Sequence, residues 1–556
     1  MRTAGDLQYG LDLAAVDPAS LNGALAQAAV RFVAKPGAAS RAVGELALEQ
    51  GSIGLGVLRR LLGAESKDLT RLDGDPRFTD RAWRENPVLS GLAESYLATT
   101  SWAHGQITSA DLPPVTRRKA ELALEILADA VAPTNLPFLN PAVVKEAIDT
   151  GGLSVARGAA NFLEDLVGNG GLPSQVDRSS SELGRDLAAT PGRVVFRNDL
   201  IELLAYEPRT EQVFAEPILY NPSWINKYYV LDLSPGRSFI EYAVDRGFAV
   251  FAISYRNPDE SMQGLTLDDY LRQGVLAALD RTAELSGSER VNLLGVCIGG
   301  TLTVAALAVL AARGEAERVG WATLLNTLVD YGEPGAIGAF TDERTIERIE
   351  RRMAKRGFLS GAELAGPFTW MRGNDLVWRY VVSSWYQGKR PPAFDILSWN
   401  ADATRLPATM HSQFLRACYL DNRLVEPGAF TIDGTPVDLS RVQTPLYVLA
   451  SETDHIAPWE SAYRTTQLVG GEEVRFVLTR GGHTVGMVTT PQSSKAWFRA
   501  NGSSPGEAAE WLRRSEQTAG SWWEDWAAWA AERSGEPVAP ATLPDGEPAP
   551  GRYVRG

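Results

Sequence analysis

The chain has 556 residues, a length that favours two or three domains over a single small core. Hydrophobic residues make up 44% of the composition, enough to bury a sizeable core, and the formal net charge of -14 argues against nucleic acid as a partner. The two cysteines, Cys297 and Cys418, cannot build a disulfide framework, so the composition favours a reducing compartment.

The sequence shows no pattern typical of a secretion signal or a membrane span. Residues Met1 to Asp12 carry Asp6 and Asp12 and lack the apolar core of a signal peptide. No stretch reaches the roughly 20 apolar residues that a transmembrane helix needs. We therefore expect a soluble cytoplasmic protein, for which adsorption to a hydrophobic surface remains possible.

Residues 1–186 are predicted to form a helical N-terminal domain. Alanine and leucine recur at three- and four-residue spacing, and no run typical of a parallel strand occurs there. The helical pattern breaks at Pro36-Gly37, Pro113-Pro114 and Asn140-Pro141. We expect the domain to close in a polar linker, Pro173 to Ser181, because that segment lacks the apolar residues of a packed element.

From residue 187 onward, short apolar runs alternate with helices, which is typical of a parallel sheet covered on both faces. Ligands gather at the carboxyl ends of the strands in such sheets, so the residues that follow each run matter most. We predict an α/β-hydrolase core with a mostly parallel sheet, in two parts, residues 187–330 and 440–556. The six predicted strands are Pro217 to Tyr220, Phe248 to Tyr255, Val291 to Leu294, Trp321 to Asn326, Leu446 to Ala450 and Arg475 to Leu478.

The insertion between the fourth and fifth strands, residues 331–439, is longer than a plain crossover requires. We expect it to form a cap, or lid, over the site. Beyond the last strand, three tryptophans share one helical face, which favours core packing over a substrate platform; they are Trp522, Trp526 and Trp529. The tail Pro548 to Gly551 is expected to lie on the surface.

The stretch Gly295 to Gly300 reads Gly-Val-Cys-Ile-Gly-Gly and predicts a sharp turn between a strand and a helix. It matches the nucleophile elbow of α/β-hydrolases, with cysteine in place of serine. Gly295 and Gly299 are expected where a Cβ atom would collide with a neighbouring element, and Cys297 would lie at the positive end of the helix. The turn alone leaves open a small buried cysteine without catalytic role.

Asp454 and His483 follow the fifth and sixth predicted strands and complete the order nucleophile, acid, histidine. In this interpretation His483 takes the proton of Cys297, while Asp454 orients and charges the imidazole. A random loop histidine is the alternative for His483. Because the three residues each follow a strand, the sequence predicts a catalytic triad.

The oxyanion that forms on an acyl carbonyl needs backbone N–H donors. We expect one donor at Ile298 and a second in the loop after the first strand, at Trp224 or Ile225. A cysteine nucleophile converts one thioester into another, so the acyl group stays activated for transfer to a hydroxyl. This chemistry favours an acyltransferase over a hydrolase, although cysteine hydrolases on this fold remain an alternative.

The other histidines and the second cysteine are assigned structural roles. His455 is interpreted as a hydrogen-bonding residue beside Asp454, His104 and His411 as surface or core residues, and Cys418 as part of the packing. Cysteine and histidine lack the paired spacing of a zinc site, so we predict no metal.

Blocks of sequence along most of the chain resemble the polyhydroxyalkanoate synthases, or poly(3-hydroxyalkanoate) polymerases, which belong to the α/β-hydrolase superfamily. The length and the helical N-terminal domain resemble the single-subunit enzymes of class I or II. One departure is Asn221-Pro222, where the family often has two prolines. The similar blocks are Asp75 to Phe78, Trp83 to Pro87, Trp224 to Tyr229, Ser254 to Pro258, Gly295 to Gly300, Phe394 to Asn400, Asp454 to Trp459, Gly482-His483 and Ser521 to Trp523.

The resemblance implies an acyltransferase that polymerises (R)-3-hydroxyacyl-CoA into polyhydroxyalkanoate polyester and releases CoA. The family's nucleophile, aspartate and general base fall on Cys297, Asp454 and His483. It implies no cofactor, since the coenzyme A thioester is the substrate, and it implies a homodimer on the surface of cytoplasmic polyester granules.

Three questions stay open at this point. A cysteine-dependent thioesterase or lipase-like hydrolase is the alternative enzyme, and a granule-coat protein without turnover is the alternative of a different class. The basic residues 351–356 could meet the coenzyme A phosphates, but a solvated helix face is the preferred interpretation; they are Arg351, Arg352, Lys355 and Arg356.

Overall fold

The computed structural model of the protein describes residues 17–64, 72–177, 179, 181–500 and 506–556. Met1 to Asp12, where we expect no signal peptide, lies outside these residues. The chain forms two compact units. The first comprises Met1–Asp177 with Ala362–Pro392, and the second comprises Arg178–Gly361 with Ala393–Gly556.

The first unit is helical, as predicted, and prolines mark where its helices begin. Five of its helices begin with proline, whose fixed φ suits the first helical position and whose missing N–H has no partner there in any case. The predicted breaks at residues 36, 114 and 141 are therefore helix starts. The helices are α1 (Pro18–Val33), α2 (Pro36–Leu61), α3 (Ala82–Glu85), α4 (Pro87–Thr108), α5 (Pro114–Val131), α6 (Pro141–Asp149) and α7 (Leu153–Gly168).

Residues 362–392 pack against α7 and belong to the first unit, although they lie inside the insertion expected as a cap. They include most of α13 (Gly361–Met371), and also η12 (Asn374–Trp378) and η13 (Val381–Tyr386). The buried Asn161 donates to the carbonyls of Ser384 and Lys389, at 3.1 and 3.2 Å. The division predicted from the sequence, with a boundary at 186 and one insertion over 331–439, did not anticipate this exchange. The gating role of the insertion stays a prediction.

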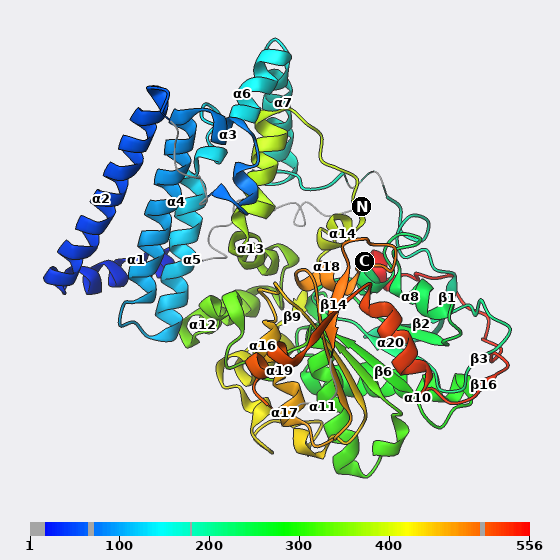
Figure 1. Ribbon diagram of the computed structural model, residues 1–556. Coiled ribbons are helices and arrows are strands. Elements are labelled where there is room, and N and C mark those ends of the chain that lie inside the picture. The colour runs from blue at the N-terminus through cyan, green and yellow to red at the C-terminus, as the bar shows by residue number, and fades with distance from the viewer. Residues whose placement is uncertain (1–16, 65–71, 178, 180, 501–505) are drawn as a thin grey trace. The chain divides into compact units, whose positions relative to one another are not determined.

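The second unit is built on a ten-stranded sheet (Figure 1). Its six central strands are parallel and correspond to the six predicted strands, which are thereby confirmed. Two antiparallel strands flank them on each side, and these four were not singled out from the sequence. In spatial order the strands are β1 (Gly192–Arg197), β2 (Ile201–Tyr206), β5 (Val250–Tyr255), β4 (Ile218–Asn221), β6 (Asn292–Val296), β7 (Ala322–Leu325), β12 (Leu446–Ser451), β13 (Val474–Thr479), β14 (Trp497–Ala500) and β15 (Glu516–Ala519).

Helices connect and cover these strands. The α-helices of the second unit are α8 (Phe239–Val244), α9 (Leu267–Asp269), α10 (Ala277–Ser286), α11 (Ile298–Arg313), α12 (Glu343–Arg356), α14 (Asp395–Asn400), α15 (Ala408–Phe414), α16 (Trp459–Tyr463), α17 (Thr465–Leu468), α18 (His483–Met487), α19 (Ala508–Arg514) and α20 (Trp522–Ala531). Three small two-stranded sheets pair β3 (Val213–Phe214) with β16 (Pro537–Val538), β8 (Phe358–Leu359) with β9 (Leu406–Pro407), and β10 (Thr431–Ile432) with β11 (Thr435–Pro436). Among the described helices, none is long and apolar enough to cross a bilayer.

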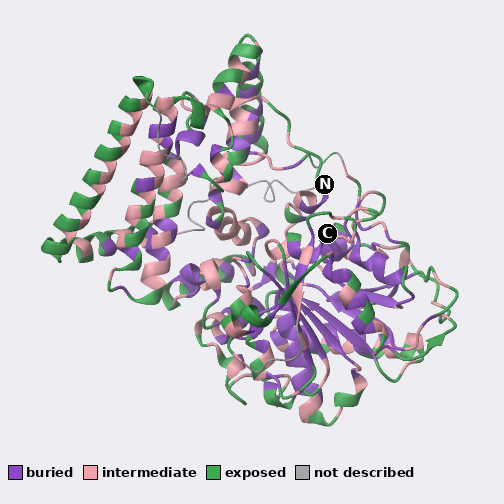
Figure 2. Cartoon of the chain, in the orientation of Figure 1, coloured by how far each residue is buried: buried purple, intermediate pink, exposed green. Residues whose placement is uncertain are grey.

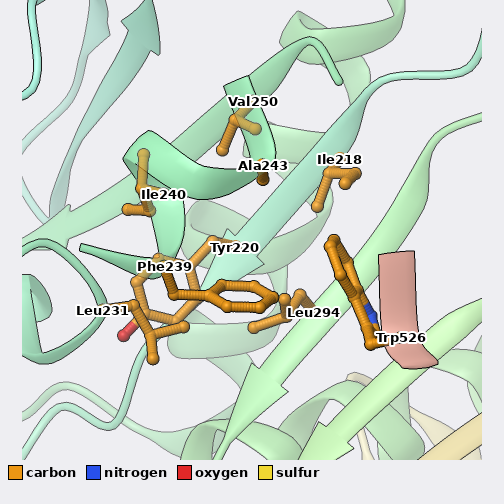
Figure 3. A pocket seen from close by; sticks show the side chains of 9 residues that line it. All are labelled: Ile218, Tyr220, Leu231, Phe239, Ile240, Ala243, Val250, Leu294 and Trp526. Carbon is orange, nitrogen blue, oxygen red and sulfur yellow. The ribbon is translucent and has the colours of Figure 1, made fainter. Parts of the chain in front are cut away.

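The central strands of the sheet are buried (Figure 2), and the tryptophan face of α20 packs against them. Trp522 and Trp526 are fully buried and Trp529 is 8% exposed, so the predicted core role of this face is confirmed. Trp526 lies beside Phe239 of α8 around a void of about 10 Å³ (Figure 3). The lining is apolar, so the void is a packing gap in the core.

The tail Pro548 to Gly551, predicted to lie on the surface, is exposed only at Pro548 and half-buried at Ala549. Pro550, Gly551 and Val554 are buried, and the backbone N–H groups of Arg552 and Tyr553 each donate to Glu202 Oε2 at 3.0 Å. Glu202 is a fully buried residue of β2. Because a buried carboxylate is costly without partners, these amides favour a docked tail.

Candidate active site

Cys297 occupies the turn between β6 and α11, with φ 52° and ψ -126°. A positive φ is rare for a residue with a side chain and costs on the order of 1–3 kcal/mol, and such strain gathers at functional sites. The turn is held by the Cys297 N–H, which donates to the carbonyl of Leu325 at 2.9 Å. Cys297 is 9% exposed.

The glycines around Cys297 allow three backbone segments to meet. A Cβ atom on Gly295 would lie 2.6 Å from the Cα of Gly300, and one on Gly299 would lie 2.3 Å from the carbonyl oxygen of Pro222. The expected need for glycine at positions 295 and 299 is therefore confirmed. Gly300, to which no such need was assigned, is equally constrained, since its Cβ would lie 1.9 Å from Thr327 Oγ1.

His483 is the first residue of α18, directly after β13 and the Gly481-Gly482 pair. Its Nδ1 lies 2.6 Å from Asp454 Oδ2. The second carboxylate oxygen of Asp454 accepts the backbone N–H groups of Ile456 and Ala457, both at 2.9 Å, and the Asp454 side chain has no exposed surface. Both oxygens of the carboxylate are therefore held by hydrogen bonds, and its negative charge lies against the imidazole.

The electrostatic surroundings of His483 favour its charged form. Burial lowers the pKa of the imidazole, but the negative charges of Asp454 and Cys297, together with side-chain hydrogen bonds to both, raise it well above its usual value. His483 thus interacts with both predicted partners at once. The arrangement therefore favours a protonated imidazole at position 483.

The loop after β4, which carries the predicted second oxyanion donor, is pinned to the start of α11. The buried Asn221 side chain donates to the Gly299 carbonyl at 2.9 Å and to Thr303 Oγ1 at 3.1 Å. The hydroxyl of Tyr255 donates to Asn221 Oδ1 at 2.9 Å. Asn221 lies at the position where the sequence departs from two prolines. The hydrogen bonds of its side chain therefore make this loop rigid.

The three predicted oxyanion donors lie on these two segments. Ile298 is the first residue of α11, so the helix itself offers no acceptor to its N–H. Trp224 is 2% exposed, and its carbonyl accepts the hydroxyl of Thr404 at 2.7 Å. The N–H of Ile225 lies 3.5 Å from the hydroxyl of Ser223, at the outer limit of a hydrogen bond.

Aromatic side chains from the insertion lie beside Cys297, a feature that the sequence analysis did not assign to the site. The rings of Tyr331 and Tyr419 are 4.7 Å apart, and Phe414 packs on both at 6.0 and 5.9 Å. The Tyr331 hydroxyl lies 2.8 Å from Thr301 Oγ1, in the first turn of α11. Burial raises the pKa of both tyrosines, and the charges of Cys418 and Cys297 add to the rise. The aromatic richness of the insertion was the only available signal.

The second cysteine lies close to this aromatic group, since its charge adds to the raised pKa of Tyr331 and Tyr419. Cys418 is buried, and burial raises its thiol pKa to about 12. His411 is buried, and burial lowers its pKa to about 4. His104 is exposed. The backbone carbonyl of His455 accepts the N–H of Ala336 at 3.3 Å.

The basic residues singled out between positions 351 and 356 lie on α12 (Glu343–Arg356). Of the basic residues on α12, Arg351 pairs with Glu347 at 3.5 Å. Within the described ranges, no three His, Cys, Asp or Glu side chains are arranged to hold a metal ion.

Two family models match the chain. Residues 74–243 match poly-beta-hydroxybutyrate polymerase (PhaC) N-terminus, and residues 217–487 match the alpha/beta hydrolase fold, in agreement with the sheet described above. Among similar proteins, poly(3-hydroxyalkanoate) polymerase 2 of Ectopseudomonas oleovorans is 43% identical over 86% of each chain. Poly(3-hydroxyalkanoate) polymerase of Methylorubrum extorquens is 39% identical over 96% of this chain and 89% of its own. Poly(3-hydroxyalkanoate) polymerase subunit PhaC of Cupriavidus necator is 40% identical over 86% and 83%.

Proposed function

The chain belongs to the poly(3-hydroxyalkanoate) polymerase family, and from this premise we propose that it polymerises (R)-3-hydroxyacyl groups from coenzyme A thioesters through a thioester on Cys297. The observation that carries the proposal is the hydrogen-bonded group around His483. Its Nδ1 is taken by Asp454 at 2.6 Å, and the imidazole also interacts with Cys297. This interaction supports a cysteine nucleophile with a histidine base.

In the first step the proton of Cys297 passes to His483. Because Nδ1 faces Asp454, Nε2 is the nitrogen available to the thiol. The thiolate attacks the acyl carbon of the substrate, the carbon–sulfur bond to coenzyme A breaks, and the departing sulfur takes the proton from Nε2. The products are an acyl thioester on Cys297 and free coenzyme A.

In the second step a 3-hydroxyl group loses its proton to His483, which is neutral again. The resulting alkoxide attacks an acyl thioester, an ester bond forms, and the displaced thiolate recovers a proton. Asp454 stabilises the imidazolium in both steps. The backbone N–H of Ile298 and one from Trp224 or Ile225 hold the oxyanion.

The aromatic group of Tyr331, Phe414 and Tyr419 suits this chemistry. The buried rings of Tyr331 and Phe414, with the partly buried ring of Tyr419, offer an apolar surface to the acyl chain and keep water from the thioester on Cys297. We propose no cofactor beyond the coenzyme A thioester itself. A homodimer in the cytoplasm, attached to granules of its polyester product, completes the proposal.

The test supplies (R)-3-hydroxybutyryl-CoA and follows thiol release together with insoluble polyester. Both products are expected from the native chain. Cys297→Ala should abolish both, whereas Cys418→Ala, the matched change of the other buried cysteine, should retain both. Thiol release with free acid would favour a hydrolase, and neither product would favour a protein without turnover. A Cys297→Ala variant that still polymerises would remove Cys297 from its role.

A further inference from the structure

The end of β7 and the turn that follows it contact the segments that lead to the proposed triad residues. The carbonyl of Leu325 accepts the N–H of Cys297 at 2.9 Å. Two residues later, Thr327 fills the space beside Gly300, where a Cβ atom would lie 1.9 Å from its hydroxyl. The residue between them, Asn326, reaches the histidine segment.

Asn326 is fully buried and has a positive φ of 44°. Its side-chain Nδ2 donates to the backbone carbonyl of His483 and to Ser451 Oγ, the latter at 3.0 Å. Ser451 Oγ lies 3.1 Å from Asn326 Oδ1, so the amide and the hydroxyl are matched on both sides. The backbone N–H of Asn326 donates to the Leu449 carbonyl at 2.8 Å, which ties the turn to β12.

We infer that Asn326 is a positioning residue that fixes the His483 imidazole against Cys297; this rests on the proposed function. His483 follows two glycines, of which Gly481 has a φ of +111°, so the chain leading to it has little stiffness of its own. Two anchors compensate. Asp454 holds the ring through Nδ1, and Asn326 holds the backbone carbonyl of the same residue.

The two anchors hold different atoms of His483, so together they fix the direction in which its imidazole ring points. A ring held only at Nδ1 could still swing about that hydrogen bond, which would move Nε2 away from the sulfur. Fixing the backbone carbonyl removes that freedom. Asparagine meets both requirements of position 326, because it tolerates a positive φ better than most side chains and supplies the amide donor.

The experiment measures how fast iodoacetamide alkylates Cys297 across pH 5 to 10, in a Cys418→Ala background. Alkylation reports the thiolate and needs no polymer synthesis. Asn326→Gly keeps the positive φ accessible and removes the amide. We expect it to lower the alkylation rate at pH 7 by about tenfold and to move the midpoint of the rate against pH to a higher pH. It should also lower kcat with little change in KM. Asn326→Asp, which keeps the shape but loses the donor, should act in the same direction.

A matched control separates positioning from simple loss of stability. Asn292 is also fully buried; its Nδ2 donates to the Glu216 carbonyl at 3.3 Å and its Oδ1 accepts the N–H of Trp321 at 3.0 Å. It lies at the start of β6, the strand end remote from Cys297. Asn292→Gly should lower the melting temperature and leave the alkylation profile unchanged.

The outcomes separate this inference from the proposed function. A profile shifted in His483→Gln but unshifted in both Asn326 variants would overturn the inference and leave the proposed triad intact. Equal shifts in Asn292→Gly and Asn326→Gly would reduce Asn326 to a structural residue. An unshifted profile in His483→Gln would overturn the proposed cysteine–histidine pairing and the inference with it. Should Asn326→Gly fail to fold, the alkylation profiles of Asn326→Asp and Ser451→Ala take its place in these comparisons.

Discussion

Replacing Asp454 with asparagine removes one charge from the centre of the site and little else. The remaining oxygen can still accept the backbone N–H groups of Ile456 and Ala457, which now hold it at 2.9 Å, so the loop should keep its shape. Two unit charges about 4 Å apart interact by about 4 kcal/mol at an effective dielectric constant of about 20. Part of this is regained through a neutral hydrogen bond, so the step that forms the imidazolium should slow by roughly 100- to 1000-fold.

Single-turnover release of coenzyme A at pH 6 to 9 measures that loss. Asp525→Asn is the matched control, because Asp525 is a mostly buried carboxylate that pairs with Arg475 and accepts the Tyr447 hydroxyl at 2.9 Å. It should leave the acylation rate close to the native value while lowering stability. Asp454→Asn turning over at nearly the native rate, with intact folding, would refute the electrostatic role assigned to Asp454.

Three further predictions concern stability. Gly299→Ala places a Cβ atom 2.3 Å from the Pro222 carbonyl and should lower the free energy of unfolding by about 1–3 kcal/mol, whereas Gly44→Ala, in α2 with nothing within 4 Å, should raise it by about 0.5–1 kcal/mol. Urea unfolding midpoints measure both, and equal effects would contradict the collision. His411 has a pKa lowered by burial from 6.5 to about 4. Between these pH values the unfolded chain binds a proton at this side chain and the folded chain does not. The free energy of unfolding should therefore fall as pH drops from 6.5 to 4, by up to about 3 kcal/mol, and His411→Gln should flatten that slope in denaturation curves. Trp526→Ala, at a fully buried position, should cost about 3–5 kcal/mol in the same assay; a loss below 1 kcal/mol would contradict its core role.

The parallel strands could be predicted from the sequence because each is a short apolar run between helices. β15 could not, since all of its residues are exposed and no apolar run marks it. The candidate site was predictable to the extent that chain order and strand ends place residues: Cys297, Asp454 and His483 lie where the ends of β6, β12 and β13 put them. Their catalytic roles stay proposals.

The remaining features depend on contacts between residues far apart in the chain. Nothing near Asn326 indicates that its amide meets the carbonyl of His483, 157 positions later. The packing of residues 362–392 on α7 likewise depends on Asn161, whose partner Ser384 is 223 positions away. Local pattern carries no information about such pairs.

The docked tail limits how the chain can be shortened or extended. Removing residues 550–556 would withdraw two amide donors from Glu202 and leave its carboxylate inside the sheet with Arg197 as its main remaining partner. A chain that ends before this segment should therefore unfold at a lower urea concentration, whatever the state of the site. A fusion partner added after Gly556 needs a linker long enough for Val554 to remain buried.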